Sequence, residues 1–131
     1  MAQILLVEDE DRMAATLRKA LERAGHSVLT AGDGRDALGI MQTSKVDLVV
    51  ADIVMPNVDG LELITEIRRT DQTTKILAIS GEAGWMPGGY LRAAGAFGAD
   101  HALKKPFSTR VFIQAVARLL AAPRASHDAH R

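Results

Sequence analysis

The feature that most constrains the fold is a short apolar segment at residues 46–52, with the sequence VDLVVAD. Its β-branched and leucine residues hardly alternate with polar ones, a pattern typical of a strand buried on both faces of a parallel sheet. Asp52 ends the segment, where such a strand leaves the sheet. Ligands of open parallel α/β sheets bind just outside those carboxyl ends. Taken alone, Asp52 could simply cap the strand, so its role depends on the neighbouring segments.

Similar apolar segments recur along the chain and alternate with amphipathic ones. Strands are expected at residues 3–7, 28–31, 75–80 and 100–103, besides 46–52. Apolar residues at helical spacing predict helices around residues 13–24, 37–41, 63–67, 90–97 and 112–120. Five strands alternating with five helices predict a doubly wound, five-stranded parallel sheet of the α/β class, with right-handed crossovers. Arg68 and Arg69 are expected to do no more than end the third helix.

Composition limits the classes of function. With 131 residues we expect one domain over residues 1–122, followed by a short polar tail at 123–131. The 16 basic and 16 acidic residues balance, so charge alone supports neither nucleic-acid nor membrane-surface binding. There are no cysteines, which excludes disulfides and thiolate metal sites. No apolar run approaches the length of a membrane span, so we expect a soluble cytoplasmic protein.

Polar side chains gather where the expected strands end. Glu8 and Asp9 follow the first strand, Asp52 ends the third, Ser80 ends the fourth, and Lys105 follows the fifth. In a parallel sheet all of these emerge at one edge. Three carboxylates held close together need a cation, and oxygen-only ligands favour Mg²⁺. The set fits an aspartate nucleophile attacking phosphorus, with Mg²⁺ and lysine neutralising the transferred group.

Four motifs in order give the chain a resemblance to a known family. They are LLVED at residues 5–9, Asp52 with Met55-Pro56 and Asp59-Gly60 behind it, Ser80-Gly81, and Lys105-Pro106-Phe107. Together they resemble the receiver domain of two-component response regulators, from about residue 3 to residue 120. The resemblance implies a flavodoxin-like fold with strand order 2-1-3-4-5.

The resemblance also implies a role for each acidic residue. Asp52 accepts the phosphoryl group. Asp9 binds Mg²⁺ directly and Glu8 through water, and the backbone carbonyl of Val54 completes the metal site. Because only that carbonyl is used, the apolar side chain of Val54 does not count against the assignment.

Two further residues are implied to contact the phosphoryl group. Ser80 binds one of its oxygens, and Lys105 reaches it from the other side of the site. Lys104 should point away, because successive side chains of a strand face opposite sides of the sheet. In this family the bond between the lysine and Pro106 is often cis.

The chain departs from the family pattern in two places. Ala102 occupies a position where many receivers carry an aromatic ring, and the loop at residues 81–89 is longer and richer in glycine than is common. We therefore expect the signal to leave through this loop, which contains Trp85, and through the helix starting near Tyr90.

The leading hypothesis is a stand-alone phosphorylation switch. It would take phosphate from a histidine kinase or histidine phosphotransfer protein and then bind or release a downstream protein target, as a monomer or weak dimer without an output domain. We expect no direct nucleic-acid or membrane binding, and no enzymatic activity beyond its own phosphotransfer and autodephosphorylation. An aspartate-based phosphohydrolase is the alternative, but it usually needs a second aspartate where Val54 stands, and a substrate cap. A phosphate-independent adaptor would lack the aspartate or the lysine, and neither is missing.

Overall fold

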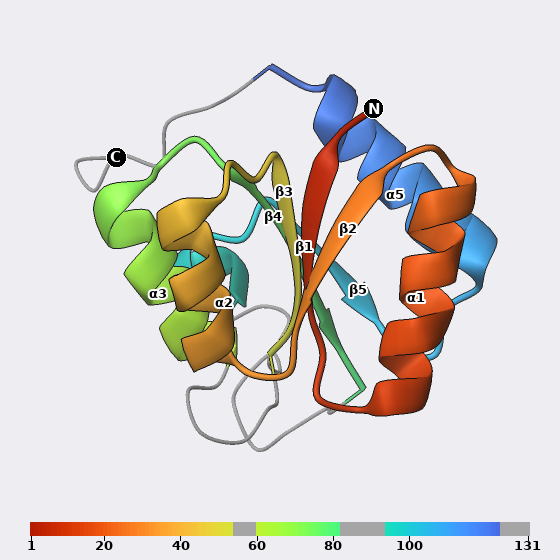
Figure 1. The fold of residues 1–131 in the computed structure, drawn as a ribbon, viewed down its shortest axis with the longest axis horizontal. Coiled ribbons are helices and arrows are strands. Elements are labelled where there is room, and N and C mark those ends of the chain that lie inside the picture. The colour runs from red at the N-terminus through yellow and green to blue at the C-terminus, as the bar shows by residue number, and fades with distance from the viewer. Residues whose placement is uncertain (54–59, 82–93, 124–131) are drawn as a thin grey trace.

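The computed structural model describes residues 1–53, 60–81 and 94–123. Its five strands form one parallel sheet in the order β2-β1-β3-β4-β5 (Figure 1). They are β1 (Gln3–Val7), β2 (Ser27–Ala31), β3 (Leu48–Asp52), β4 (Lys75–Ser80) and β5 (His101–Lys104). The predicted fold class and strand order are confirmed. The central strand begins at Leu48, two residues later than expected.

Three of the helices begin at polar caps that the sequence supplies. The helices are α1 (Asp11–Arg23), α2 (Gly34–Thr43), α3 (Gly60–Thr70) and α5 (Thr109–Ala121), with a further helical turn at residues 94–97. The side chains of Glu10, Asp33 and Ser108 accept hydrogen bonds from amides in the first turns of α1, α2 and α5. Such caps satisfy amides that have no partner within the helix.

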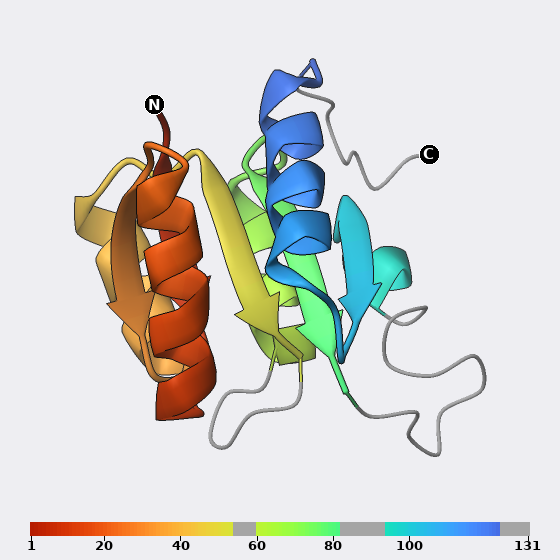
Figure 2. The same ribbon diagram turned by 90° about the vertical axis from the view of Figure 1, so that its right-hand side faces the viewer.

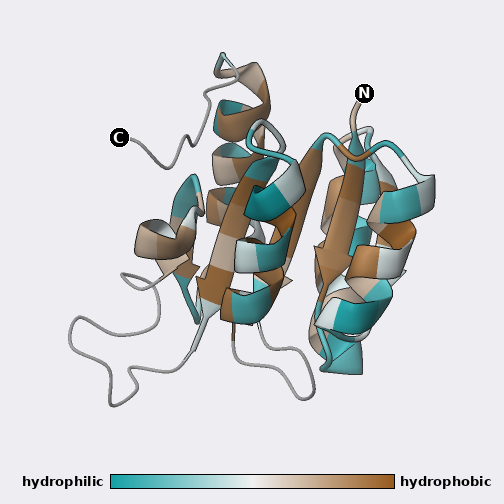
Figure 3. Cartoon of the chain, turned by 90° about the vertical axis from the view of Figure 1, so that its left-hand side faces the viewer, coloured by the Kyte–Doolittle hydropathy of each residue, from teal (hydrophilic) through white to brown (hydrophobic). Residues whose placement is uncertain are grey.

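The sheet separates two apolar cores. On one side α1 and α5 pack against Ile4, Leu6, Val50 and other strand residues, whereas α2, α3 and the turn at residues 94–97 cover the opposite side (Figures 1 and 2). Figure 3 shows the apolar strands between helices whose outer surfaces are more polar. Because both faces are covered, neighbouring residues of β3 are buried on opposite sides, as the continuous apolar pattern predicted.

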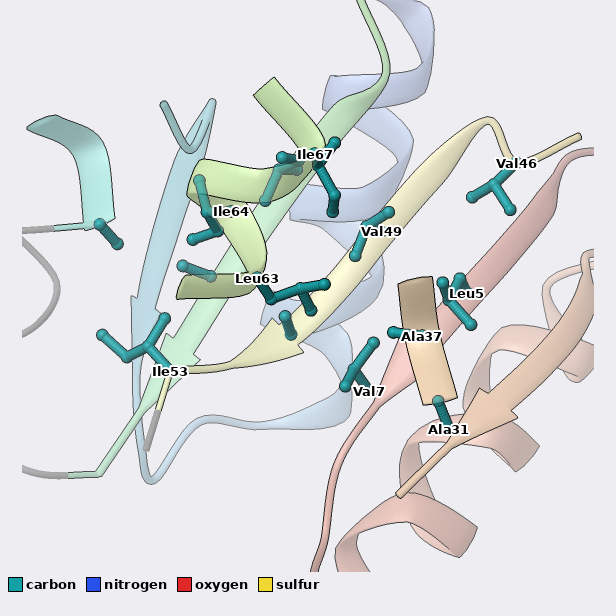
Figure 4. Packing of buried hydrophobic residues seen from close by; sticks show 14 residues of the cluster. Leu5, Val7, Ala31, Ala37, Val46, Val49, Ile53, Leu63, Ile64 and Ile67 are labelled. Carbon is teal, nitrogen blue, oxygen red and sulfur yellow. The ribbon is translucent and has the colours of Figure 1, made fainter. Parts of the chain in front are cut away.

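Figure 4 shows the core on the α2 and α3 side. Val7 and Val49 of the sheet lie there with Leu63 and Ile67 of α3, and each of them is at most 2% exposed. Burying side chains of this size contributes roughly 1.5–3 kcal/mol each. This packing holds α3 against the carboxyl end of β3.

Gly60 is the first residue of α3, which therefore begins three residues before the helix expected around residues 63–67. A Cβ atom at this position would lie 2.5 Å from the carbonyl oxygen of Asp52 and 2.2 Å from Cα of Ile53. Only glycine therefore lets α3 start directly against the end of β3. The close approach fixes the backbone around Asp52.

All five strands run in the same direction, so their carboxyl ends meet at one edge of the sheet, where the arrowheads of Figure 2 lie. In register, Asp52 of β3 pairs with Ile79 of β4, and Ser80 of β4 pairs with Lys104 of β5. Among the helices of the described ranges, none combines the length and the apolar character needed to cross a membrane.

Candidate functional site

The polar residues singled out in the sequence lie together at the carboxyl edge of the sheet. Glu8 is 4% exposed and Asp52 is 6% exposed, whereas Ser80 is fully buried. Asp9 faces solvent. Val54, the expected source of a backbone ligand, lies outside the described residues.

Lys105 directly follows β5, the edge strand, and its side chain reaches across the site. Its Nζ lies 2.8 Å from Oδ2 of Asp52 and 3.1 Å from Oε1 of Glu8. Lys104 is exposed, so the alternation along the strand is as predicted. Lys105 therefore bridges the ends of β1 and β3 from its position directly after β5.

The backbone around Lys105 is held in place on both sides. Its amide donates to the carbonyl oxygen of Ser80 at 2.8 Å, and the Lys105–Pro106 peptide bond is cis, as the resemblance implied. Gly81 lies beside the lysine stem, and a Cβ there would be in van der Waals contact with Cβ of Lys105 at 3.4 Å. The ring of Phe107 stacks on Phe112 of α5 at 5.7 Å between centroids.

Negative charge exceeds positive charge in this cluster. Glu8, Asp9 and Asp52 can each offer a carboxylate oxygen, and these atoms lie within 4.8 Å of one another. Among the described residues, one ammonium group, that of Lys105, contacts the cluster. The ligands that these residues offer are three carboxylates, with no nitrogen or sulfur donor among them, and such a hard, oxygen-only set is the one that Mg²⁺ prefers. The residues present are consistent with Mg²⁺ binding.

The pKa values of two side chains are shifted by burial and by these neighbouring charges. The pKa of Glu8 is raised by burial first and by the charge of Asp52 second, and the Glu10 amide and Lys105 only partly oppose these effects. Burial alone would lower the pKa of Lys105, but the hydrogen bonds and charges of Asp52 and Glu8 outweigh it and raise that pKa. Lys105 is thus held in its charged form, while ionised Glu8 is disfavoured.

The expected signalling elements are only partly described. Ala102 is half-buried against the α3-side core, so β5 does present a small side chain where an aromatic ring was anticipated in the family pattern. Trp85, Tyr90 and all of the 81–89 loop except Gly81 lie outside the described residues.

Arg68 is a structural residue that the sequence reasoning missed. Its side chain is 8% exposed and donates to the carbonyls of Gly98 (3.0 Å), Thr74 (2.7 Å) and Asp71 (3.2 Å) and to Oδ2 of Asp100 (3.0 Å). The expectation of a simple helix end is therefore wrong for Arg68.

The helical spacing held a signal for this position. Arg68 follows Ile64 by four residues, which places it on the buried face of α3 rather than with the exposed Arg69. Arg68 ties the end of α3 to the residues just before β4 and just before β5, and so fixes the start of the strand that carries Ser80.

Two other histidine and carboxylate positions need no function. His26 is half-buried, and its Nδ1 accepts a hydrogen bond from the Ala2 amide at 3.2 Å. Burial first, and the N-terminal amine second, lower its pKa. The Asp47 carboxylate accepts from the Gln3 amide at 2.9 Å, at the opposite edge of the sheet from Asp52.

Comparison with known proteins agrees with this geometry. The family model of the response regulator receiver domain matches residues 4–117. The transcriptional regulatory protein CpxR of Klebsiella pneumoniae is 38% identical over 129 residues, which are 97% of this chain and 51% of that protein. The chain spans about half, or less, of the length of the transcriptional regulatory proteins that it matches.

Solved structures show the same fold. The chemotaxis response regulator CheY4 of Vibrio cholerae has a TM-score of 0.83 and 30% identity, covering 91% of this chain and 98% of that one. The response regulator TrrA of Thermotoga maritima, solved in complex with Mg²⁺ and BeF, has a TM-score of 0.81 and 30% identity, covering 91% and 99%. With its strand order, its acidic edge and nearly its whole sheet matched, the chain belongs to the response regulator receiver domain family.

Proposed function

We propose that this receiver domain is a phosphorylation switch in which Asp52 accepts a phosphoryl group from a histidine kinase or histidine phosphotransfer protein. The observation that carries the proposal is the contact of Lys105 with Asp52 at 2.8 Å, inside a cluster of three carboxylates. Such an arrangement costs folding energy through repulsion. It is explained if the site exists to receive a charged group together with a cation.

The proposed transfer uses groups that lie at this edge. One carboxylate oxygen of Asp52 attacks phosphorus, and a P–O bond forms as the P–N bond of the donor phosphohistidine breaks. The electron pair of that bond stays on the imidazole nitrogen, which takes a proton from water. Lys105 remains charged and moves its hydrogen bond from the carboxylate to a phosphoryl oxygen. Ser80, at the end of β4, is proposed to donate its hydroxyl proton to another phosphoryl oxygen.

Mg²⁺ is the proposed cofactor. Glu8, Asp9 and Asp52 would hold it, with the backbone carbonyl of Val54 as a further expected ligand. When bound, the metal would neutralise charge on the transferred group. This role is supported by the oxygen-only ligand set and by the related TrrA, which was solved with Mg²⁺ and BeF.

We further propose that the domain is a stoichiometric acceptor rather than a turnover enzyme, and that phosphorylation changes its binding of a downstream protein target. Its matches include transcriptional regulatory proteins and the chemotaxis regulator CheY4, which differ in how much of the protein the receiver occupies. Three statements therefore stay predictions: that the receiver stands alone, that it contacts no nucleic acid, and that it lies in the cytoplasm.

The test is incubation with a small phosphodonor and Mg²⁺, followed by intact-mass measurement. One added phosphate is expected, and it should be lost in base. Asp52→Asn should abolish the addition, whereas the matched change Asp36→Asn, at an exposed carboxylate of α2, should leave it unchanged. Phosphate that still appears on the Asp52→Asn protein contradicts the assignment, and steady hydrolysis of small phosphate esters contradicts the acceptor role.

A further inference from the structure

Helices α2 and α3 lie side by side on one face of the sheet (Figure 1). Because α2 leads to the start of β3 and α3 to the start of β4, both helices end at the amino edge, opposite Asp52. The carboxyl end of a helix carries partial negative charge, since its last carbonyls have no partner within the helix. Two such ends side by side make this corner of the molecule negative.

A groove opens between the two helices near these ends. Its cavity of about 350 Å³ is lined by Leu38, Met41 and Gln42 of α2, by Glu66 and Ile67 of α3, and by Asp71. We call it the α2–α3 groove. Leu38 and Met41 are half-buried and pack on the core, so the floor of the groove is apolar, whereas Gln42 and Glu66 are exposed at its rim.

The negative end of α2 is not offset within its own helix. A basic side chain in the last turn would stabilise that end, but the last turn of α2 contains none. Lys45 comes only after the C-cap residue Ser44, and its side chain faces solvent. A cation supplied from outside the chain would therefore find a favourable position at the end of α2.

The two arginines at the end of α3 are already paired. Arg68 turns inward and lies 3.0 Å from the carboxylate of Asp100. Arg69 lies 3.6 Å from Glu66, and both of these side chains are largely exposed. The charges of each pair cancel, so neither arginine offsets the further carboxylate that follows α3.

That further carboxylate is Asp71, which keeps its charge. It accepts hydrogen bonds from the amides of Thr73 and Thr74, at 2.9 Å each, and from both threonine hydroxyls. Burial alone would raise the pKa of Asp71, but the hydrogen bonds from Thr74 and Thr73 outweigh it and lower that pKa. These donors are neutral, so they hold the carboxylate ionised without cancelling its charge.

We propose that the α2–α3 groove docks a basic amphipathic helix of a protein partner. Apolar side chains of that helix would lie on Leu38 and Met41, and its lysine or arginine side chains would lie against Asp71 and the carboxyl end of α2. The negative rim repels nucleic acid and anionic lipid, and the apolar floor gives a small cation nothing to bury. The inference goes beyond the phosphorylation switch and does not depend on it, because no groove residue is proposed to contact the phosphoryl group or Mg²⁺.

The test uses the full chain and a synthetic helical peptide of about 16 residues, with leucines on one face and lysines beside them. Mg²⁺ is present, so that the carboxylates at the other edge of the sheet do not attract the lysines. Backbone amide shifts followed by NMR should cluster at residues 38–43 and 66–71, and binding should weaken as salt is raised. Control peptides with glutamate for each lysine, or serine for each leucine, should not bind.

Opposite changes at one exposed position locate the site. Gln42→Lys supplies the basic residue that α2 lacks, so it should raise Tm slightly and weaken peptide binding by roughly three- to ten-fold. Gln42→Glu should lower Tm slightly and tighten binding. Glu22→Lys, at an exposed carboxylate of α1, changes the net charge by more than either and should alter the affinity by less than about two-fold.

Four results would overturn the proposal. The first is a set of amide shifts confined to the carboxyl edge around Glu8, Asp9 and Asp52. The second is equal affinity for the serine and leucine peptides, which would mean that charge alone holds the peptide. The third is an unchanged affinity in both Gln42 variants. The fourth is self-association of the chain that the peptide displaces, which would make a second copy the occupant of the groove.

Discussion

Lys105 and Arg68 are both largely buried cations, yet they stand in opposite situations. Arg68 donates to three carbonyls and to Asp100, and the Asp100 carboxylate is itself bound by the Ile76 amide at 2.8 Å. Lys105 faces Glu8 and Asp52, with Asp9 beside them. Around Arg68, fixed donors and acceptors are matched. Around Lys105, three carboxylates share its ammonium group, which is the one cation that contacts them within the described residues.

The difference separates a structural cluster from a functional one. A buried charge is tolerated when hydrogen bonds and an opposite charge surround it, and the Arg68 cluster meets that condition. The Lys105 cluster keeps surplus negative charge, at a cost that folding alone does not explain. Unbalanced charge of this kind is expected at ligand-binding sites. We therefore expect the same kind of substitution to have different effects at Arg68 and at Lys105.

The largest effect is expected at Arg68. Arg68→Met should lower the free energy of unfolding by about 3–5 kcal/mol, because it leaves Asp100 buried without its cation. The matched control Arg69→Met, at a side chain 70% exposed, should change it by less than about 0.5 kcal/mol. Denaturant titration measures both. A loss below about 1 kcal/mol for Arg68→Met would show that the cluster is not structural.

A smaller loss is expected at Lys105. Lys105→Ala removes the one ammonium, so Glu8 and Asp52 repel each other more strongly, and about 1–3 kcal/mol should be lost in the absence of metal. Mg²⁺ should restore much of it, since the cation replaces the missing charge. The protein should still be phosphorylated but should no longer change its partner binding. Equal effects from Lys104→Ala, the exposed neighbour, would reject this register.

The smallest effect concerns Glu8 and depends on pH. Because the folded pKa of Glu8 is raised above 4.5, protonated Glu8 favours the folded state, and this contribution is lost as pH rises through the folded pKa. Glu8→Gln should therefore stabilise the metal-free protein slightly at neutral pH, with no gain below the unfolded pKa. Thermal unfolding across that pH range checks this. Destabilisation at neutral pH would mean that Glu8 is a favourable partner of Lys105 rather than surplus charge.

The sequence predicted the sheet well, because parallel strands buried on both faces have continuous apolar patterns and end at polar residues. The positions of Asp52 and Ser80 follow from that rule alone, whereas the choice of Lys105 over Lys104 depended on the family resemblance and on alternation along the strand. Gly60 and Arg68 did not follow from it. Their roles depend on contacts with Ile53 and with Gly98, and neither contact is visible in local periodicity.

The central claim is that the carboxyl edge carries surplus negative charge suited to a divalent cation. Mg²⁺ titration of the unmodified protein, followed by thermal unfolding, tests it most directly. A ligand at a hundred times its dissociation constant stabilises the folded state by about 2.7 kcal/mol. We predict a rise of this kind for the native chain, a much weaker one for Asp9→Asn and Asp52→Asn, and an unaltered one for Asp36→Asn. Stabilisation by Mg²⁺ that persists undiminished in both site variants, or that is absent from the native chain, would contradict the account.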